Sequence, residues 1–441
     1  MQSGTAQPHL LYIAWGYPPA RGSGVYRALA TPNAFAREGW QVTVLTADEE
    51  SFGNYTGADR SLLEYIDPAI EVVRIPFVRE TTDPRIHRWS RARIEAPNLW
   101  MGLQNTKAML QFPEPKYGQW RPALERAVRD IHRRKPVDLS IATANPHVDF
   151  VAAYALGQVG VPYVMDYRDA WQLDVFSGNR LTRPHSRVAR WERRMVGDAH
   201  EVWFVNEPIA AWHRDLYPDA ANRMFVVPNG HDGSVRPSGA VPPGDGEPLR
   251  FGYIGTVSSR VPVTEFIAGW RRARTRQNVL AGATADVYGY VGFDDAPSQQ
   301  RTLLAEAEAE GEQLGVRFRG PVRKSDVSAT YASFDALLLI LGTGRYVTSG
   351  KVFEYLATGL PIVSVHDPTN AASEVLQDYP LWFPAASLSA DDIADALARA
   401  AQEIRTPDER RWEDAATWHH RTAREAVLAP RIEALRKAVA R

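Results

Sequence analysis

A lysine and a glutamate stand one helical turn apart, just before an apolar run, in the stretch TSGKVFEYLATGLPIVSV. Ser349 and Gly350 come directly before Lys351, and Glu354 follows on the next turn. Backbone N–H groups at a helix start, together with the Lys351 ammonium, can hold phosphate oxygens. The Glu354 carboxylate can accept hydrogen bonds from a diol such as ribose. The pattern predicts a nucleotide site, and the alternative is an ion pair on a solvated helix face.

A second candidate for phosphate binding is the stretch GYIGTVSSRVPV, which ends a predicted strand at Gly255. Thr256 and Arg260 follow before the next expected helix. Glycines, hydroxyl groups and one arginine at a helix N-terminus suit a diphosphate. A solvated loop arginine is the alternative for Arg260.

A glycine turn near the start of the chain is a candidate ligand loop. Gly22, Ser23 and Gly24 lie between the first predicted strand and a helix expected to begin near Val25. Glycines let backbone N–H groups approach a ligand, and the helix start adds partial positive charge, so the turn suits a phosphate or a sugar hydroxyl. The pattern is not a complete G-x-G-x-x-G, so an ordinary strand-to-helix connection stays open.

Polar residues also follow the strands predicted at 138–143 and 161–166. His147 comes just past the first of these strands, where a neutral imidazole can hydrogen-bond a sugar hydroxyl. Arg168 and Asp169 follow the second strand and are expected at the same edge of the sheet. The alternatives are a packed or capping histidine and an internal Arg–Asp ion pair that shapes the loop.

Length, charge and cysteine content limit the classes of protein to which the chain can belong. The 441 residues predict two or three compact units, and 51 basic against 52 acidic residues give no whole-chain field that attracts nucleic acid. The chain has no cysteine, which excludes thiolate nucleophiles and cysteine-ligated metals and fits a reducing cytoplasm. The N-terminus lacks a signal-peptide pattern, and no window reaches the roughly 18 apolar residues of a membrane span. We expect a cytoplasmic protein.

Short β-rich runs alternate with helical stretches, which predicts α/β architecture with parallel sheets. The predicted strands are 10–14, 41–46, 138–143, 161–166, 201–205 and 224–228, then 249–255, 285–290, 316–320, 336–341 and 360–365. The Pro- and Gly-rich segment 236–248 predicts a linker. We expect two doubly wound Rossmann-like domains, 1–235 and 249–411, facing a central cleft, because ligands bind beyond the carboxyl ends of parallel strands. The amphipathic segment 412–441 is a candidate to pack back on the first domain.

Taken in order along the chain, these motifs resemble the retaining GT-B glycosyltransferases of family 4. The resemblance rests on ATANP followed by GVPYVMDYRDAW, on VPNGHD before the linker, on GYIGT and on TSGKVFEYLATGLPIVSV, and it covers nearly the whole chain. It implies an acceptor-binding first domain and a second domain that binds a sugar nucleotide as donor substrate, with no separate cofactor.

The resemblance also implies roles for individual residues. Glu354 matches the glutamate that binds the donor ribose, while Arg260 and Lys351 match the basic residues that face the diphosphate. The backbone near Val322, in RGPVRK, would meet the base. His147 and the glycine loop before the first helix would face the transferred sugar and the acceptor. We therefore expect His147, Arg260 and Lys351 to be the catalytic residues.

Two positions depart from the family pattern. Many relatives carry a second glutamate seven residues before the ribose-binding one, and this chain has Val347 there. The usual arginine after the first glycine of the second domain is Thr256 here, and Arg260 stands near the position of an expected lysine. Neutralisation of the phosphates is therefore expected to rest on Arg260 and Lys351.

The implied reaction is front-face substitution, in which the leaving phosphate oxygen accepts the acceptor's proton. Fixed cations and helix N-termini stabilise the departing diphosphate, so no protein nucleophile is required. The sequence holds no D-x-D triplet, and we expect no metal. The expected function is transfer from a UDP- or GDP-sugar to a small-molecule or glycan acceptor, and the Ala/Arg-rich composition suggests specialised-metabolite biosynthesis.

One segment leaves the choice of acceptor open. Residues 84–135 hold 12 Lys or Arg against 4 Asp or Glu, interleaved with aromatic residues. The segment can contact a membrane surface and a lipid-linked acceptor, frame a polar small molecule, or be a solvated insertion. Its apolar residues, such as Leu99, Leu103 and Leu110, can equally belong to the core.

Two further functions are compatible with the same fold. A sugar-nucleotide epimerase would need paired acid and base carboxylates at the cleft, and the sequence points to no such pair. A nucleotide-sugar-binding protein without catalysis would bind the donor and leave it intact. Turnover of the donor in the presence of acceptors distinguishes a transferase from this binding protein.

Overall fold

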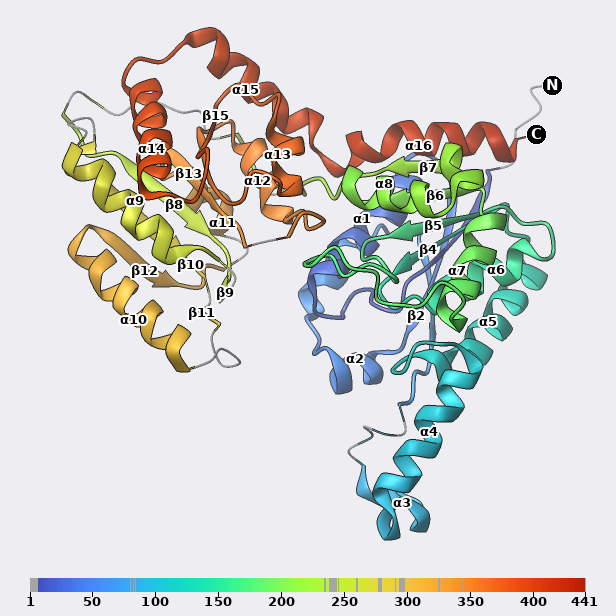
Figure 1. The fold of residues 1–441 in the computed structure, drawn as a ribbon. Helices are drawn as coiled ribbons and strands as arrows, with labels where there is room; N and C mark the ends of the chain where they lie inside the picture. The colour runs from blue at the N-terminus through green and yellow to red at the C-terminus, as the bar shows by residue number, and fades with distance from the viewer. Residues whose placement is uncertain are drawn as a thin grey trace, which may run out of the picture. The chain divides into compact units, whose positions relative to one another are not determined.

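The structure is a computed structural model that describes residues 7–79, 81, 83, 85–233, 235–237, 244, 246–258, 261–276, 280–289, 291–292, 298–323, 326–342 and 344–440. The chain divides into two compact units (Figure 1). Unit 1 comprises Met1–Asp174, Asn179–Pro228 and Leu428–Arg441, and unit 2 comprises Val175–Gly178 and Asn229–Val427. Most of the predicted linker 236–248 lies outside the described residues, as does Arg260.

Unit 1 is built on a seven-stranded parallel sheet with the order β3-β2-β1-β4-β5-β6-β7. Its strands are β1 (His9–Ile13), β2 (Gln41–Ala47), β3 (Glu71–Ile75), β4 (Leu139–Ala144), β5 (Tyr163–Tyr167), β6 (Glu201–Phe204) and β7 (Met224–Val226). All but β3 lie where the apolar runs predict a strand. The strand β3 was not predicted, because this edge strand is half-buried and lacks a continuous apolar run.

Several helices of unit 1 bury an apolar face against its sheet. In α5, for example, Leu124, Val128 and Ile131 are buried, since their spacing places them on one side of the helix. The helices are α1 (Ser23–Arg37), α2 (Glu49–Tyr55), α3 (Arg91–Glu95), α4 (Pro97–Gln111), α5 (Arg121–Arg134), α6 (Asp149–Gly157), α7 (Arg187–Asp198) and α8 (Glu207–Leu216), with the short 3-10 helices η1 (Arg60–Tyr65), η3 (Ile86–Arg88), η4 (Gly118–Trp120) and η5 (Pro218–Arg223).

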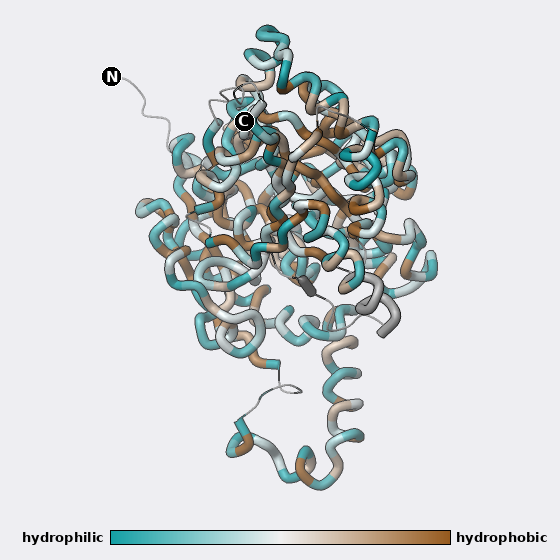
Figure 2. The backbone as a smooth tube through the Cα atoms, turned by 90° about the vertical axis from the view of Figure 1, so that its left-hand side faces the viewer, coloured by the Kyte–Doolittle hydropathy of each residue, from teal (hydrophilic) through white to brown (hydrophobic). Residues whose placement is uncertain are grey.

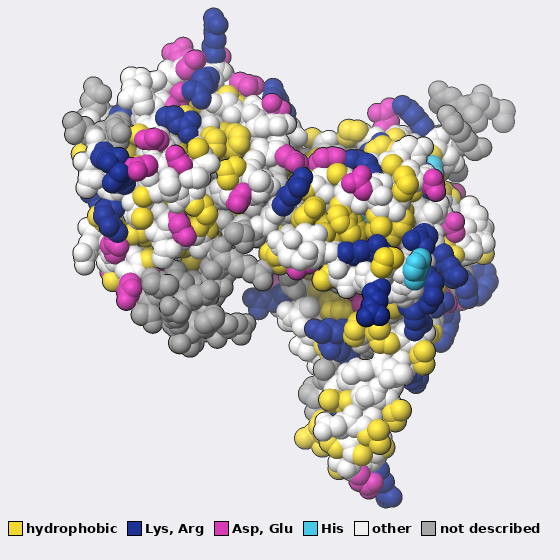
Figure 3. All heavy atoms as spheres, in the orientation of Figure 1, with side chains coloured by type: hydrophobic (Ala, Val, Ile, Leu, Met, Phe, Trp, Pro, Cys, Tyr) yellow, Lys and Arg dark blue, Asp and Glu magenta, His cyan; other side chains and the backbone are white. Residues whose placement is uncertain are grey.

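Two helices of unit 1 extend away from its sheet. Between β3 and β4 the chain forms α3 and α4, which extend away from the rest of the unit in both ribbon and tube views (Figures 1 and 2). The space-filling view shows hydrophobic side chains on this projection (Figure 3). In the described part of the chain, no helix combines the length and the apolar character needed to cross a bilayer.

The last helix, α16 (Arg424–Val439), begins in unit 2 and belongs to unit 1 from Leu428 onward. Leu428, Ile432 and Leu435 are buried in the unit 1 core, on one face of the helix. Arg431 pairs with Glu201 at the start of β6. Of the segment 412–441, therefore, only the end joins unit 1, whereas α15 (Glu409–Arg421) packs against α12 (Gly350–Thr358) in unit 2.

Unit 2 is built on a six-stranded parallel sheet with the order β12-β10-β8-β13-β14-β15. Its strands are β8 (Arg250–Ile254), β10 (Thr284–Tyr288), β12 (Val316–Gly320), β13 (Ala336–Ile340), β14 (Ile362–Val365) and β15 (Trp382–Pro384), and β9 (Val257–Ser258) pairs with β11 (Val291–Gly292) outside this sheet. The short edge strand β15 was not predicted. The predicted pair of doubly wound parallel sheets is confirmed.

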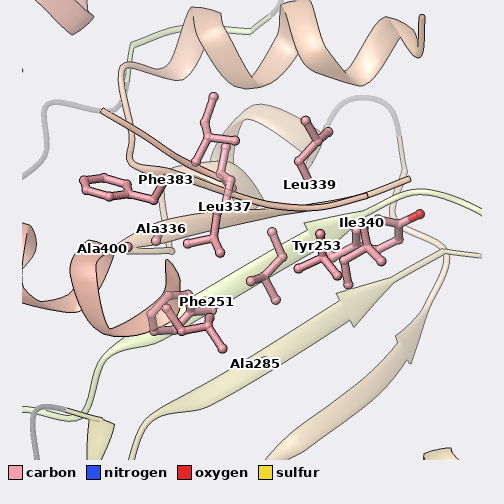
Figure 4. Close-up of a cluster of buried hydrophobic side chains, with 14 of the residues drawn as sticks. Phe251, Tyr253, Ala285, Ala336, Leu337, Leu339, Ile340, Phe383 and Ala400 are labelled. Atoms are coloured by element: carbon pink, nitrogen blue, oxygen red, sulfur yellow. The ribbon is translucent and has the colours of Figure 1, made fainter. Parts of the chain in front are cut away.

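The core of unit 2 lies on both faces of its central strands. Figure 4 shows Phe251, Leu337 and Leu339 among the side chains that meet there, and all three are fully buried. The helices of the unit are α9 (Val263–Arg276), α10 (Ser298–Gln313), α11 (Val327–Tyr331), α12 (Gly350–Thr358), α13 (Ala371–Leu376), α14 (Ala390–Arg405) and α15 (Glu409–Arg421).

Each sheet has one point at which the order of its strands reverses. In unit 1 this point lies between β1 and β4, and in unit 2 it lies between β8 and β13. Loops that leave neighbouring strands in opposite directions open a crevice at their carboxyl ends, where α/β proteins bind ligands. The carboxyl ends of the strands at these two points are therefore where ligand-binding residues are expected.

Candidate active site

The helix that carries Lys351 and Glu354 begins at the reversal point of unit 2. The Ser349 hydroxyl accepts a hydrogen bond from the Lys351 backbone N–H, so Ser349 caps α12. The helix ends at Gly359, whose left-handed backbone (φ 73°) turns the chain into β14. The predicted helix start is thus confirmed, and Gly350 occupies its exposed first position.

The side chain of Lys351 reaches back to the end of β8. Its Nζ donates a hydrogen bond to the Tyr253 hydroxyl at 2.8 Å and lies 4.5 Å from the centre of the Tyr253 ring. A Cβ added to Gly255 would lie 1.8 Å from this Nζ, so a glycine is required for the lysine to cross there. Burial lowers the pKa of the Lys351 ammonium to about 8, and the Glu354 carboxylate opposes this shift.

Glu354 is oriented by a buried tyrosine. Its Oε2 accepts a hydrogen bond of 2.9 Å from the Tyr331 hydroxyl. Burial, reinforced by the neighbouring Glu354, raises the pKa of Tyr331, so this phenol stays protonated and remains a donor. Glu354 itself is half-buried, with a carboxylate that can accept further hydrogen bonds from a ligand.

The remaining donor-site candidates lie at the same edge of the unit 2 sheet. Gly255 and Thr256 directly follow β8, and the Thr256 carbonyl accepts a hydrogen bond from the Tyr253 hydroxyl at 3.0 Å. Val322 lies in the loop after β12 and is half-buried. The close approach of Gly289, whose added Cβ would lie 2.0 Å from the Gly255 carbonyl oxygen, brings the ends of β8 and β10 together.

A cavity of about 250 Å³ lies at the reversal point of unit 1. Gly22, Gly24 and Arg168 line it, so the structure brings together three of the residues predicted to bind the acceptor or sugar. A Cβ on Gly24 would lie 1.2 Å from Arg168 Nη1, which shows that the guanidinium lies across this glycine. Arg168 also forms an ion pair of 3.0 Å with Asp169. The Ser23 side chain is outside the described atoms.

His147 and Asp169 do not line this cavity. His147 is 6% exposed, and its ring stacks on Trp171 with the two ring centres 5.1 Å apart. Its Nδ1 lies 3.4 Å from Glu114 Oε1, and its Nε2 lies 3.2 Å from the Asp169 carbonyl oxygen. This geometry matches the packed histidine that the sequence left open, and a catalytic role for His147 stays a prediction.

The structure identifies residues at the two candidate sites that sequence reasoning missed. In unit 1 these include Arg21 and Asn145. Arg21 directly precedes the glycine turn, so its sequence position was an available signal. In unit 2, Tyr253 lies near the end of β8, two residues before Gly255, so its place in the sequence was also an available signal. Tyr331 gave no such signal, because only the folded chain brings it to Glu354.

Two buried carboxylates hold the loops around the unit 1 cavity. Asp166 accepts hydrogen bonds from Arg27 at 2.6 to 3.1 Å, and Arg27 also donates to the Val227 carbonyl, which ties α1 to the ends of β5 and β7. Asp149 accepts a hydrogen bond of 2.7 Å from the Trp15 backbone N–H beside the cavity. Burial raises the pKa of Asp149 well above its ordinary value. Both carboxylates hold the chain segments around the cavity in place through these hydrogen bonds.

Over the described residues, no group of three or more His, Cys, Asp or Glu side chains is arranged to hold a metal ion. Among the described residues, the charged groups at the two reversal points include Lys351 and Glu354 in unit 2, and Arg21 and Arg168 in unit 1. Cations at a strand edge and a helix start suit anionic ligands.

Two doubly wound parallel units in one chain are the architecture found in the GT-B class of glycosyltransferases. Residues 22–230 match the family of glycosyl transferase 4-like domains, and residues 248–404 match glycosyl transferases group 1. The chain belongs to the glycosyltransferases that combine these two domains. The expected family is confirmed. No sequence among the curated proteins matches the chain.

Solved structures agree on the fold. A glycosyltransferase from Rickettsia africae has a TM-score of 0.64, at 11% identity over 98% of both chains. An α,α-trehalose 6-phosphate synthase from Burkholderia multivorans has a TM-score of 0.61, at 13% identity over 98% of this chain and 97% of that one. The E. coli trehalose-6-phosphate structure bound with UDP-2-fluoro glucose has a TM-score of 0.59, at 12% identity over 97% of this chain and 99% of that one. At these identities the likeness shows the fold alone.

Proposed function

We propose that this glycosyltransferase takes its sugar from a UDP- or GDP-linked donor and transfers it with retention to a small-molecule or glycan acceptor. The observation that carries the proposal is the position of Lys351 and Glu354 on the first turns of α12, at the reversal point of the unit 2 sheet. A nucleoside diphosphate offers phosphates to a cation and ribose hydroxyls to a carboxylate, which is the pair of groups found here.

The electrostatics of Lys351 support a phosphate ligand. Burial disfavours the charged ammonium, and its hydrogen-bond acceptor is the neutral Tyr253 hydroxyl. A phosphate at the end of β8 would stabilise the ammonium and raise its pKa again. Gly255 places no side chain beside the lysine, and the N-terminus of α12 adds partial positive charge.

In unit 1, the cavity lined by Gly22, Gly24 and Arg168 is the proposed site for the acceptor or the transferred sugar. Arg21 and Asn145 add a guanidinium and an amide to its lining. These groups bind hydroxyl and anionic substituents through directed hydrogen bonds. The proposal thus gives one ligand class to each unit.

The proposed reaction is a single substitution at the anomeric carbon. The bond from this carbon to the phosphate oxygen breaks, and a bond to the acceptor atom forms on the same face of the sugar. The acceptor's proton passes to the leaving phosphate oxygen, so the products are the glycosylated acceptor and the nucleoside diphosphate. Lys351 and the start of α12 stabilise the negative charge that develops on the leaving group.

Isothermal titration calorimetry of the full chain with UDP, GDP, ADP and TDP, in buffer that contains EDTA, tests the donor site. We expect one nucleoside diphosphate to bind without added metal, and its sugar conjugate to bind at the same site. Release of the diphosphate in the presence of acceptors then separates an enzyme from a binding protein, and NMR of the product gives the anomeric configuration. Failure of every nucleotide to bind would refute the proposal.

A further inference from the structure

The exposed hydrophobic side chains of the described residues are concentrated in one projection. Eleven large hydrophobic residues are exposed, and six of them lie between Ile86 and Leu110, in η3, α3 and α4. Large apolar residues scattered singly on a surface need no explanation, whereas a contiguous group marks a site of contact. The projection therefore exposes apolar surface to water, which is energetically unfavourable.

Three of these residues form a stripe along α4. Leu99, Leu103 and Leu110 are 67%, 62% and 67% exposed, and their spacing of four and seven residues places them on one face of the helix. Within α4 only Ala108 is buried, so the unit 1 core leaves this helix almost uncovered. A helix that exposes a stripe of leucines in this way lacks a partner for that stripe within unit 1.

The projection is held in shape by its own contacts. The Arg93 guanidinium lies 3.9 Å from the centre of the Trp89 ring and 5.1 Å from that of Trp100, and it donates a hydrogen bond to the Asp83 carbonyl oxygen at 3.1 Å. Cation–π pairs of this kind stabilise a compact arrangement outside a large core. The leucine stripe is thus presented on an ordered helix.

The projection joins a basic face of unit 1. Arg187 on α7 donates to the Met109 and Leu110 carbonyl oxygens at 2.6 and 2.8 Å, which anchors the end of α4 beside α7. Helices α5 and α7 both pack against α6. Their exposed basic residues are Arg126, Arg129, Arg133, Arg134, Arg190, Arg193 and Arg194. Figure 3 shows Lys and Arg side chains gathered on the part of unit 1 where Figure 1 places α5 and α7, next to the projection.

We propose that η3, α3 and α4 form a docking surface for a lipid bilayer that carries anionic headgroups. The leucine stripe enters the boundary between headgroups and acyl chains, and the arginines of α5 and α7 attract the negative surface. A second copy of the chain fits this surface less well, because a symmetric contact would bring two clusters of arginines together. The inference goes beyond the proposed function, since it concerns where the enzyme works and does not depend on its donor.

Co-sedimentation of the full chain with vesicles tests the proposal. One set of vesicles contains equimolar phosphatidylcholine and phosphatidylglycerol, and the other contains phosphatidylcholine alone, both at about 0.1 M salt, where the Debye length is about 10 Å. The test variant combines Leu99→Ser, Leu103→Ser and Leu110→Ser. The matched control combines Tyr65→Ser and Val159→Ser, which change exposed hydrophobic residues elsewhere on unit 1.

We expect the unmodified chain and the control to bind anionic vesicles at least tenfold more strongly than the three-leucine variant. Because the leucines are exposed, the variant should keep the thermal midpoint of the unmodified chain. A variant with Arg190→Gln, Arg193→Gln and Arg194→Gln should lose binding to anionic vesicles in the same way as a rise in salt does.

Other results would contradict docking to a bilayer. Failure of the unmodified chain to bind anionic vesicles, or equal binding by the three-leucine variant, would overturn the proposal. So would a dimer that forms without vesicles and is lost in the three-leucine variant, which would assign the surface to self-association. Because every readout is vesicle binding or mass, these outcomes do not depend on whether a nucleotide donor has been found.

Discussion

The Lys351 ammonium lies 2.8 Å from the Tyr253 hydroxyl and crosses the bare backbone of Gly255 to reach it. Because that hydroxyl donates its own proton to the Thr256 carbonyl, it offers a lone pair to the lysine. The lysine is thus held over the end of β8 by a neutral group. A phosphate that arrives there meets a cation whose charge is only partly compensated, and this relationship leads to the first two predictions.

Removal of the cation should weaken nucleotide binding. Lys351→Ala is expected to lower the affinity for the preferred nucleoside diphosphate at least about tenfold, because a charge-assisted hydrogen bond contributes about 1.5 to 3 kcal/mol. Gly255→Ala should have a similar effect, since the new Cβ occupies the position of the lysine Nζ. Calorimetry measures both, with Lys437→Ala, an exposed lysine of α16, as control. An affinity within twofold of the unmodified chain would place the diphosphate elsewhere.

Nucleotide affinity should depend on pH through Lys351. Its pKa of about 8 in the free protein means that the ammonium is mostly charged near pH 7 and deprotonates as the pH rises. Since a phosphate binds the charged form, the affinity should be nearly constant below about pH 7.5 and fall by up to about tenfold per pH unit above about pH 8. Titrations between about pH 7 and 9.5 measure this, and Lys351→Ala should abolish the dependence. A flat profile for the unmodified chain would contradict the assignment.

Recognition of ribose should depend on Glu354. The unmodified chain is expected to bind a nucleoside diphosphate at least about tenfold more tightly than its 2′,3′-dideoxy analogue, and Glu354→Ala should remove this preference. Tyr331→Phe, which deletes the hydroxyl that orients the carboxylate, should reduce the preference without abolishing it. The control is Glu413→Ala, which changes an exposed glutamate of α15. Equal discrimination in Glu354→Ala would show that the ribose lies away from this carboxylate.

The buried pair of Arg27 and Asp166 should matter for stability. Asp166→Asn removes one charge from a pair whose side chains are 6% and 0% exposed, which leaves the other charge buried without its partner. Urea denaturation should show a loss of about 3 to 5 kcal/mol in the free energy of unfolding. Asp130→Asn, which breaks the exposed pair with Arg133, should change that free energy by less than about 1 kcal/mol. Similar losses in the two variants would argue against the burial of Asp166.

His147 distinguishes a positioning role from a catalytic one. Its ring is packed on Trp171 and next to Glu114, so His147→Ala should lower the thermal midpoint by several degrees as these contacts are lost. The exposed His185→Ala is the control. Melting curves are compared with the rate of diphosphate release. An unchanged midpoint combined with a rate loss above about a hundredfold would restore the catalytic role predicted from the sequence.

Most central strands could be predicted from the sequence, because a strand buried on both faces is a nearly continuous apolar run, as in β13. The start of α12, with Lys351 and Glu354 on its first turns, could be predicted as well, since capping and the spacing of neighbours on a helix are local properties. The roles of these two residues stay predictions. The edge strands β3 and β15 were missed, because an edge strand needs no such run.

Local patterns along the chain were enough to establish the two α/β domains, their family and the helix that carries Lys351 and Glu354. The partners of these two residues became visible only in the folded chain, because Tyr253 and Tyr331 come from distant strands and helices. The same holds for the packing of His147 and the exposure of the α4 leucines. A helical stripe of leucines has the same sequence whether it faces a core or solvent, and burial is a property of the whole fold.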